Sequence, residues 1–133
     1  MDRRTLAWAS AILLVAVALG AFGAHGLKSR VAPEAVAQWH TAVEYQFYHG
    51  LALFGLALLG TRLPASRLRL IRGLFLAGIF LFSGSIYLLA TRDVFGTQGL
   101  TPVVGPVTPL GGLCFIAGWA VLFITALRMA DDR

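Results

Sequence analysis

The chain has 133 residues, of which 58% are hydrophobic and only 13% are charged, and its mean hydropathy is +0.78. Soluble domains carry about 25% charged residues, so this chain has too few polar side chains to cover a water-facing surface. The composition therefore excludes a soluble enzyme domain, a disordered tail, a coiled coil and a disulfide scaffold. The length allows one domain, and we expect residues 1–133 to form a single small integral membrane domain.

Four long apolar runs, separated by charges or prolines, follow one another along the chain. A membrane-spanning helix needs about 20 mostly apolar residues, with a range of about 17–25. The runs predict an all-α, four-helix membrane bundle with spans at about 5–25, 42–61, 73–91 and 110–128. They lack the alternation of a membrane barrel. A cleaved signal peptide is the alternative for the first run, but its apolar core would be longer than the roughly 7–15 residues usual for such signals.

The cations are unevenly distributed between the two sides that four spans create. The side with both termini carries eight of them: Arg3, Arg4, Arg62, Arg67, Arg69, Arg72, Arg128 and Arg133. The other side carries three: Lys28, Arg30 and Arg92. Because cytoplasmic loops are rich in Lys and Arg, we expect both termini in the cytoplasm. The net charge of +5 then reflects topology and lipid contact rather than nucleic-acid binding.

The segments between the spans differ in kind. On the inner side, the basic loop 62–72 would contact anionic lipid head groups through Arg62, Arg67, Arg69 and Arg72. On the outer side, Pro33-Glu34 is a favourable helix start, so 31–41 is either an interfacial helix before the second span or an outward extension of that span. The second outer segment, 92–109, contains Pro102, Pro106 and Pro109 and is expected to be an irregular cap. Gly26 should cap the first helix and Thr108 the fourth.

Small residues recur at four-residue or seven-residue steps in three of the spans. Small residues let membrane helices approach closely, although glycine is also simply common in such helices. The positions that could pack in this way are Ala16, Gly20 and Ala24 in the first span, Gly73, Ala77 and Gly84 in the third, and Gly111, Cys114 and Gly118 in the fourth.

A polar group is predicted at one depth in the outer half of the second and third spans. Ionisable residues inside a span are costly and are the first place to look for function. At about 1.5 Å rise per residue, His49 and Gln46 lie at the depth of Ser83 and Tyr87 on the antiparallel neighbour. These four side chains could form one hydrogen-bond cluster, either as structural glue between helices or as a binding site.

Other polar residues of the outer half are weaker candidates. His40 and Glu44 form an i,i+4 pair on a different face from His49, with Glu44 expected at the interface, paired with His40 or a loop cation. His25 ends the first span. The nine-residue separation of His40 and His49, and the absence of a Cys-x-x-Cys-His or His-Glu-x-x-His motif, argue against a metal or haem site.

Four blocks of residues resemble one family of small membrane proteins. They are GAFGAHGLK at 20–28, WHTAVEYQFYH at 39–49, FSGSIY at 82–87 and TPLGG at 108–112, the last followed by Gly118-Trp119. In these blocks and their order the chain resembles the YgdD/YwdK-like small inner-membrane proteins, a domain-of-unknown-function family with a small eukaryotic transmembrane relative. The resemblance implies a four-helix membrane protein with no assigned activity and no catalytic residues. The positions matching the motifs are His25, Trp39, Gln46, His49, Ser83, Tyr87, Pro109 and Gly112. One departure is segment 92–109, which looks longer than is typical.

The expected function is non-enzymatic, with no cofactor, in a bacterial inner (plasma) membrane. The leading hypothesis is binding of a lipid or a membrane protein partner, including a second copy of the chain. The alternative is a transporter or channel-like protein for a small solute with an outward polar cavity. The candidate binding residues are His25, Trp39, His40, Glu44, Tyr45, Gln46, His49, Ser83 and Tyr87.

Overall fold

The computed structural model describes residues 1–131, with side chains described through Met129, and these residues form helices and turns without a strand. This confirms the all-α prediction. The helical elements are α1 (Arg3–Phe22), η1 (Gly23–Leu27), α2 (Pro33–Leu58), α3 (Ala65–Gly78), η2 (Ile79–Ser83), α4 (Gly84–Ala90), α5 (Arg92–Phe95), η3 (Gln98–Leu100), α6 (Thr101–Val104) and α7 (Val107–Asp131). Arg133, one of the eight cations counted above, lies outside the described residues.

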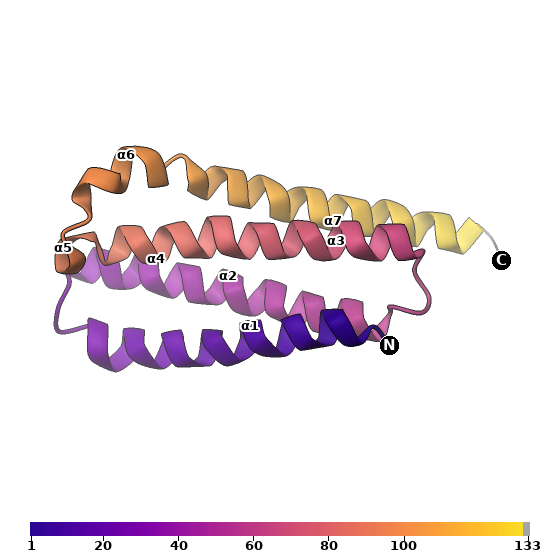
Figure 1. Ribbon diagram of the computed structural model, residues 1–133, viewed down its shortest axis with the longest axis horizontal. Helices are drawn as coiled ribbons and strands as arrows, with labels where there is room; N and C mark the ends of the chain where they lie inside the picture. The colour runs from indigo at the N-terminus through magenta and orange to yellow at the C-terminus, as the bar shows by residue number, and fades with distance from the viewer. Residues whose placement is uncertain (132–133) are drawn as a thin grey trace.

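These elements make four long helical segments, which lie side by side and alternate in direction (Figure 1). The π turns η1 and η2 continue α1 and join α3 to α4, so we call the whole segment Ala65–Ala90 the α3–α4 helix. α1 begins and α7 ends at the same end of the molecule, which is also where α2 connects to α3 (Figure 1). The other end holds the α1–α2 connection and the short helices α5 and α6.

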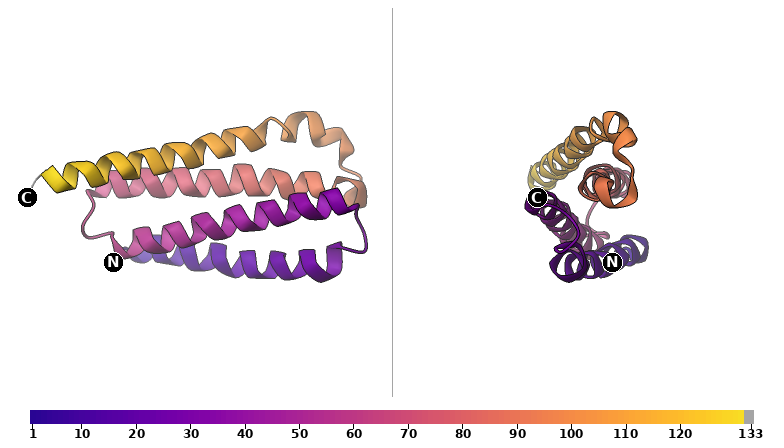
Figure 2. Two further views of the ribbon diagram at one scale, coloured as in Figure 1. Left: turned by 180° about the vertical axis from the view of Figure 1, so that it is seen from behind. Right: turned by 90° about the vertical axis from the view of Figure 1, so that its left-hand side faces the viewer.

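Two helical hairpins make up the molecule. α1 packs along α2, and α7 packs along α3 and η2, while α2 joins the two pairs through its contacts with η2 and α4. The end-on view shows that α1 and α7 are far apart, with α2 and the α3–α4 helix between them (Figure 2). α2 and the α3–α4 helix are therefore the central elements.

Three of the long segments are apolar and long enough to cross a membrane: Arg3–Leu27, Ala65–Ala90 and Gln98–Met129. The 26-residue α2 is long enough but carries Glu44, Gln46 and His49 in its middle, which lower its hydropathy. Gln46 and His49 are both buried against other helices. Burial in protein is the usual location of polar side chains in membrane helices.

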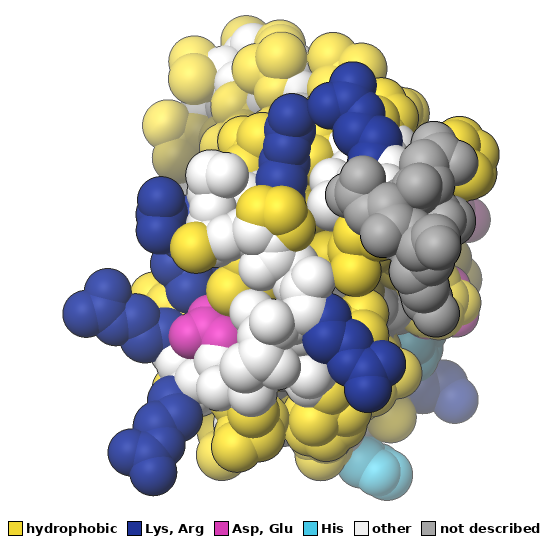
Figure 3. Space-filling view, turned by 90° about the vertical axis from the view of Figure 1, so that its right-hand side faces the viewer, with side chains coloured by type: hydrophobic (Ala, Val, Ile, Leu, Met, Phe, Trp, Pro, Cys, Tyr) yellow, Lys and Arg dark blue, Asp and Glu magenta, His cyan; other side chains and the backbone are white. Residues whose placement is uncertain are grey.

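The surface is largely apolar along the sides and basic at one end. Large side chains are exposed on all four long segments, including Leu14, Phe54, Phe80 and Ile116. Such continuous apolar surface is unusual for a soluble monomer. At the end where α1 begins, Lys and Arg side chains project around the rim (Figure 3). This separation of apolar sides from a charged end is what a lipid bilayer requires.

Close helix contacts occur at some of the predicted small residues. Ala16 is completely buried, and a Cβ on Gly20 would lie 3.4 Å from Val43 Cγ1. A Cβ on Gly111 would collide with the backbone nitrogen of Phe82, and one on Gly118 would lie 2.6 Å from the Phe75 ring. Glycine is thus required where α7 meets the α3–α4 helix. The other positions behave differently: Ala24 is exposed, and open space surrounds Gly73 and Gly84.

Of the two alternatives for 31–41, the structure has the extension of the second long helix and not a separate interfacial helix, because α2 runs unbroken from Pro33 to Leu58. The loop expected at 62–72 is wrong in its second half. α3 begins at Ala65, directly after Pro64, so Arg67, Arg69 and Arg72 lie in its first turns. Charge ends a hydrophobic run but does not end a helix, because Arg is a good helix former.

The outer segment 92–109 is more ordered than its prolines suggested. Pro102 stands in the first turn of α6, and Pro109 is the third residue of α7. A proline costs no hydrogen bond at these positions, because the first four N–H groups of a helix have no partner within it. The expected caps are wrong for related reasons: η1 carries the first helix past Gly26 to Leu27, and α7 begins at Val107, before Thr108.

Candidate functional site

Gln46 connects three helices from its position on α2. Its side-chain nitrogen donates to the carbonyl oxygen of Ile12 on α1 at 2.9 Å, and the Tyr87 hydroxyl on α4 donates to its side-chain oxygen at 2.7 Å. Both ends of the amide are therefore paired, as burial away from water requires. Depth matching on antiparallel helices predicted that Gln46 and Tyr87 could meet, and the structure joins them.

Ser83 and His49 do not join that network. The Ser83 hydroxyl donates to the carbonyl oxygen of Ala42 at 2.7 Å, which links the end of η2 to α2. His49 faces α7 instead, where no partner was predicted for it. The four expected side chains therefore do not form one cluster. They are divided among the contacts of α2 with α1, with the α3–α4 helix and with α7.

His49 is enclosed by two hydrogen bonds and a stacked ring. The distance from Nδ1 to the Tyr45 carbonyl oxygen is 2.9 Å, and Trp119 Nε1 donates to Nε2 at 3.1 Å. The carbonyl can only accept and the indole can only donate, so the neutral tautomer with hydrogen on Nδ1 satisfies both. The Phe115 ring is stacked on the imidazole with centroids 3.5 Å apart and an interplanar angle of 9°. With Nε2 occupied, His49 has no nitrogen free for a ligand or a metal.

We call the region around His49, where α2, the α3–α4 helix and α7 meet, the aromatic seam. Ring pairs at centroid distances of 4.6 to 6.2 Å run through it. Its members are Tyr45, His49, Phe75, Phe82, Phe115 and Trp119. Trp119 was not predicted as the partner of His49. The signal available was the Gly118-Trp119 pair, in which the glycine allows the close approach of α7.

The opposite side of α2 carries a groove instead of packed rings. We call this region, between α1 and the α3–α4 helix, the open seam. Its groove has a volume of about 320 Å³ and an almost wholly apolar surface. It is lined by Trp8, Ala11, Ile12, Val15, Leu19, Gln46, Ile79, Phe80, Gly84 and Tyr87. Gln46 and Tyr87 are thus the two residues of the predicted polar cluster that line this groove.

Trp39 holds the outer ends of α1 and α2 together. Its indole nitrogen donates to the Leu19 carbonyl oxygen at 2.8 Å, and its ring lies 4.5 Å from that of Tyr87. A Cβ on Gly23 would lie 2.5 Å from the indole, so only glycine leaves room for this ring. Trp39 and Tyr87 together pack the outer end of the molecule beyond the open seam.

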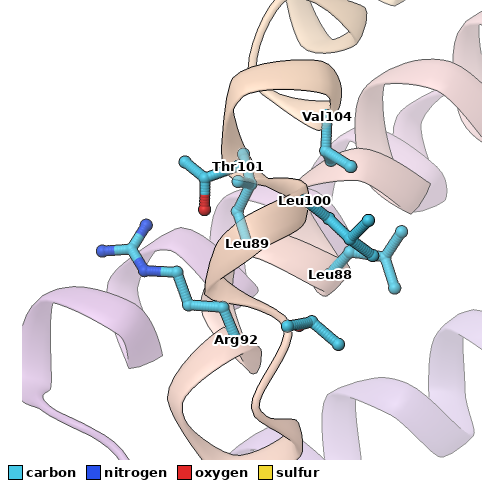
Figure 4. A pocket seen from close by; sticks show the side chains of 7 residues that line it. Leu88, Leu89, Arg92, Leu100, Thr101 and Val104 are labelled. Atoms are coloured by element: carbon cyan, nitrogen blue, oxygen red, sulfur yellow. The ribbon is translucent and has the colours of Figure 1, made fainter.

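The remaining outer candidates are not brought together. His25, His40 and Glu44 are exposed, and no ion pair of Glu44 occurs among the residues that the structure describes, so its expected pairing with His40 or a loop cation is not formed. Nor does any group of three His, Cys, Asp or Glu side chains within the described residues have the geometry to hold a metal ion. A hollow between α4 and α6 measures only about 10 Å³, and Arg92 points away from Leu88 and Leu100 there (Figure 4). That is room for about one water molecule.

A polar clamp, missed in the sequence, ties the two hairpins together at the basic end. Asp2, the N-cap of α1, accepts hydrogen bonds from the Thr5 hydroxyl and, at 3.0 Å, from Arg72 Nη1 on α3. The Thr5 hydrogen bond is the main cause that lowers the pKa of Asp2, and the Arg72 charge acts in the same direction. Asp2 stands three residues before Thr5, which is a capping pattern that could have revealed it.

The four arginines expected at lipid head groups fall into different environments. Arg62 and Arg69 are exposed, while Arg67 is half-buried beside a hollow between α3 and the end of α7. Arg72 is 18% exposed and is paired with Asp2. Its guanidinium is therefore held in place rather than free to search for lipid.

Comparison with known proteins agrees with the helical membrane architecture. A family model described as "Protein of unknown function (DUF423)" matches residues 19–112. The UPF0382 membrane protein YwdK of Bacillus subtilis is 40% identical over 116 residues, covering 86% of this chain and 89% of the relative. A UPF0382 membrane protein of Staphylococcus haemolyticus is 37% identical over 115 residues, covering 86% and 88%. One from Staphylococcus epidermidis is 40% identical over 117 residues, covering 88% and 89%.

No solved structure matches the chain. The relatives carry the printed description of membrane proteins, which agrees with the three apolar segments long enough to span a bilayer. The resemblance of the four sequence blocks to the YwdK-like proteins is thereby confirmed, and the chain belongs to the DUF423 family of membrane proteins.

Proposed function

We propose that the chain crosses a bacterial inner membrane four times as a four-helix bundle with both termini in the cytoplasm. Two observations support this topology. The four long helical segments alternate in direction, and the described cations gather at the end where α1 begins. Cytoplasmic segments are the ones rich in Lys and Arg. In this arrangement α2 also crosses the membrane, as the second span, with Gln46 and His49 shielded from lipid by neighbouring helices.

Cysteine labelling of intact cells tests the topology. The chain has one native cysteine, Cys114, which is replaced by serine. Ser29 and Ser66 are exposed residues at opposite ends of the molecule, and each is changed to cysteine in a separate variant. A membrane-impermeant maleimide should label the variant at 29 in intact cells and the variant at 66 only after lysis. Labelling of the variant at 66 in intact cells would contradict a cytoplasmic inner loop.

The activity we propose is non-enzymatic binding of a membrane component, a lipid or a protein, along the open seam. The observation that carries it is the groove of about 320 Å³ beside α2. In the part of the chain that the structure describes, every buried side-chain nitrogen and oxygen has a hydrogen-bond partner. Acid, base or nucleophilic chemistry needs a group free to exchange protons or electrons with a substrate. An apolar groove with saturated polar groups instead suits recognition by shape.

Photo-crosslinking in cells tests the binding role. Benzoylphenylalanine replaces Phe80, which lines the groove and is 59% exposed, or Ile116, a control on α7 that is 67% exposed. Both side chains face the membrane to a similar extent, so random lipid contact should be equal. A discrete adduct formed from position 80 and not from position 116 would support a binding groove. The same diffuse products from both positions would contradict it.

A further inference from the structure

The groove of the open seam continues into a polar hollow at its basic end. That hollow, of about 490 Å³, is lined by Arg4, Ala7, Trp8 and Arg72. Trp8 lines both spaces and is 45% exposed. Since residues three or four apart share a face of a helix, α1 presents one continuous stripe along the two spaces: Arg4, Trp8, Ile12, Val15 and Leu19. The stripe changes along its length from charged to aromatic to aliphatic.

This order of polarity matches one leaflet of a bilayer. Cations favour the depth of the phosphates, tryptophan favours the interface, and aliphatic side chains favour the acyl chains. From Trp8 to Leu19 the helix rises by about 16 Å, while half of the hydrocarbon core is about 15 Å thick. The groove therefore extends through about one leaflet, from the basic end to the level of Leu19 and Tyr87.

Arg4 and Arg72 line the polar hollow, which we call the mouth of the groove, and they can bind a phosphate there. Arg72 uses Nη1 for Asp2 and Thr5, but a guanidinium has five N–H donors in a planar fork that suits phosphate oxygens. The Asp2 contact holds that fork in one place. Arg4 is exposed beside it. Asp2 is the sole carboxylate paired with Arg72 among the described residues, so the mouth keeps a net positive charge.

The size of the groove favours an acyl chain over a helix. An α-helix with its side chains is about 10 Å across, so a 16 Å length occupies about 1,300 Å³. That is roughly four times the groove volume of about 320 Å³. A single flexible hydrocarbon chain can follow the narrower space.

We infer that the open seam is a binding site for an anionic phospholipid of the leaflet on the side of the termini. One acyl chain lies along the groove between α1 and the α3–α4 helix, and the phosphate lies at Arg4 and Arg72. This inference rests on the proposed binding function and specifies its ligand.

Quenching of tryptophan fluorescence by brominated lipids tests the site. The full chain in detergent micelles is titrated with phosphatidylglycerol or phosphatidylcholine whose acyl chains carry bromine. Subtracting the signal of a Trp8→Phe variant isolates quenching at Trp8 from that at Trp39 and Trp119. Because an arginine near the surface adds about 1 kcal/mol of attraction to anionic lipid, Trp8 should respond to phosphatidylglycerol at a mole fraction at least about fivefold lower than to phosphatidylcholine.

Two matched pairs of variants separate the site from general effects. Arg4→Gln should weaken the response to phosphatidylglycerol about fivefold and leave phosphatidylcholine unchanged, whereas Arg69→Gln, at an exposed arginine outside the groove, should have little effect. Gly84→Leu should reduce quenching by both lipids because it fills the groove. Its control is Gly55→Leu, at a glycine with equally open surroundings on the opposite face of α2 from Gln46.

Three results would overturn the inference: equal quenching by the two lipids, equal effects of Arg4→Gln and Arg69→Gln, or equal effects of Gly84→Leu and Gly55→Leu. A discrete protein adduct at position 80 without a preference for phosphatidylglycerol would also overturn it, while leaving the proposed binding function in place. The absence of any discrete adduct would overturn both.

Discussion

The two seams beside α2 differ sharply although the polar residues that face them are three positions apart. His49 lies in the aromatic seam, where Phe115 is stacked at 3.5 Å and Trp119 closes the remaining nitrogen. Gln46 lies in the open seam, beside a groove of about 320 Å³. Both side chains have all their polar atoms paired. Polarity alone therefore does not distinguish a buried side chain packed among rings from one that lies beside a groove.

The side chains on the partner helices decide which seam closes. α7 and the α3–α4 helix supply large rings to His49, and glycines at 78 and 118 let these rings lie against the opposing backbone. On the other side, Ala11 and Gly84 are too small to span the space between α1 and α4. α1 and the α3–α4 helix are linked through Gln46 and through the Asp2–Arg72 pair instead. One seam is thus filled by side chains, and the other keeps a groove.

The largest difference between the seams should appear when a glycine on each side gains a methyl group. In Gly111→Ala the new Cβ would meet the backbone of Phe82, which cannot rotate away. Overpacking costs about 1–3 kcal/mol, and a backbone collision places this variant near about 3 kcal/mol. In Gly84→Ala the methyl enters open space, so the gain in helix propensity should stabilise the protein by about 0.5–1 kcal/mol.

Equilibrium unfolding in mixed micelles with increasing sodium dodecyl sulfate measures both effects, and helical circular dichroism reports the folded fraction. The two alanine variants carry the same chemical change, so each is the control for the other. A loss of stability in both, or in neither, would show that the seams are equally packed and would contradict the comparison.

A second, smaller difference is expected between the hydrogen bonds of the two seams. Double-mutant cycles combine His49→Phe with Trp119→Phe, and Gln46→Leu with Tyr87→Phe. Interhelical hydrogen bonds in a membrane protein average about 0.6 kcal/mol and reach about 1.7. The His49–Trp119 pair should couple by about 1 kcal/mol, because the stacked Phe115 ring fixes the imidazole. The Gln46–Tyr87 pair should couple by about 0.6 kcal/mol or less, because its side chains have room to move beside the groove.

The same unfolding measurement gives all four corners of each cycle. The Phe substitution at 49 keeps a ring against Phe115, so the cycle reports the hydrogen bond rather than the stack. If the Gln46–Tyr87 pair coupled more strongly than the His49–Trp119 pair, the open seam would be the more rigid of the two, which would contradict the comparison.

Helix rise and hydrophobic runs were enough to predict part of this arrangement. The meeting of Gln46 with Tyr87 needed only a fixed rise and two antiparallel neighbours. To predict the contact of His49 with Trp119, the rotation of α7 about its axis must also be known. That rotation is set by the close helix contacts at Gly78, Gly111 and Gly118. Such tertiary contacts have no local signal in the sequence.

Helix ends were harder to predict because an apolar run and the helix that contains it do not begin or end at the same residue. Arg67 and Arg72 were assigned to a loop, yet they occupy the first turns of α3, where long cationic side chains can reach the interface. The open seam was also missed. The glycine pattern could not distinguish Gly84, which leaves a space, from Gly118, which accepts a ring.

The smallest expected effect concerns the Asp2–Arg72 clamp at the basic end of the open seam. Asp2→Asn keeps an N-cap side chain but removes the charge that faces Arg72. The Asn side-chain oxygen can still accept hydrogen bonds from Thr5 and Arg72, and the pair lies at the charged end of the molecule, so the loss should be below about 1 kcal/mol. The Thr5 hydrogen bond lowers the pKa of Asp2 from 3.8. A lowered pKa stabilises the folded state above the unfolded value, and that stability disappears as pH falls through the folded value.

The difference in melting temperature between wild type and Asp2→Asn should therefore be constant near neutral pH and shrink below about pH 3.8, the ordinary Asp value. Thermal scans in detergent across this range measure it, with Arg69→Gln as a control for loss of surface charge at the same end. A difference in melting temperature that persists or grows in acid would mean that Asp2 acts as a neutral cap, and that the basic end of the open seam is held by packing alone.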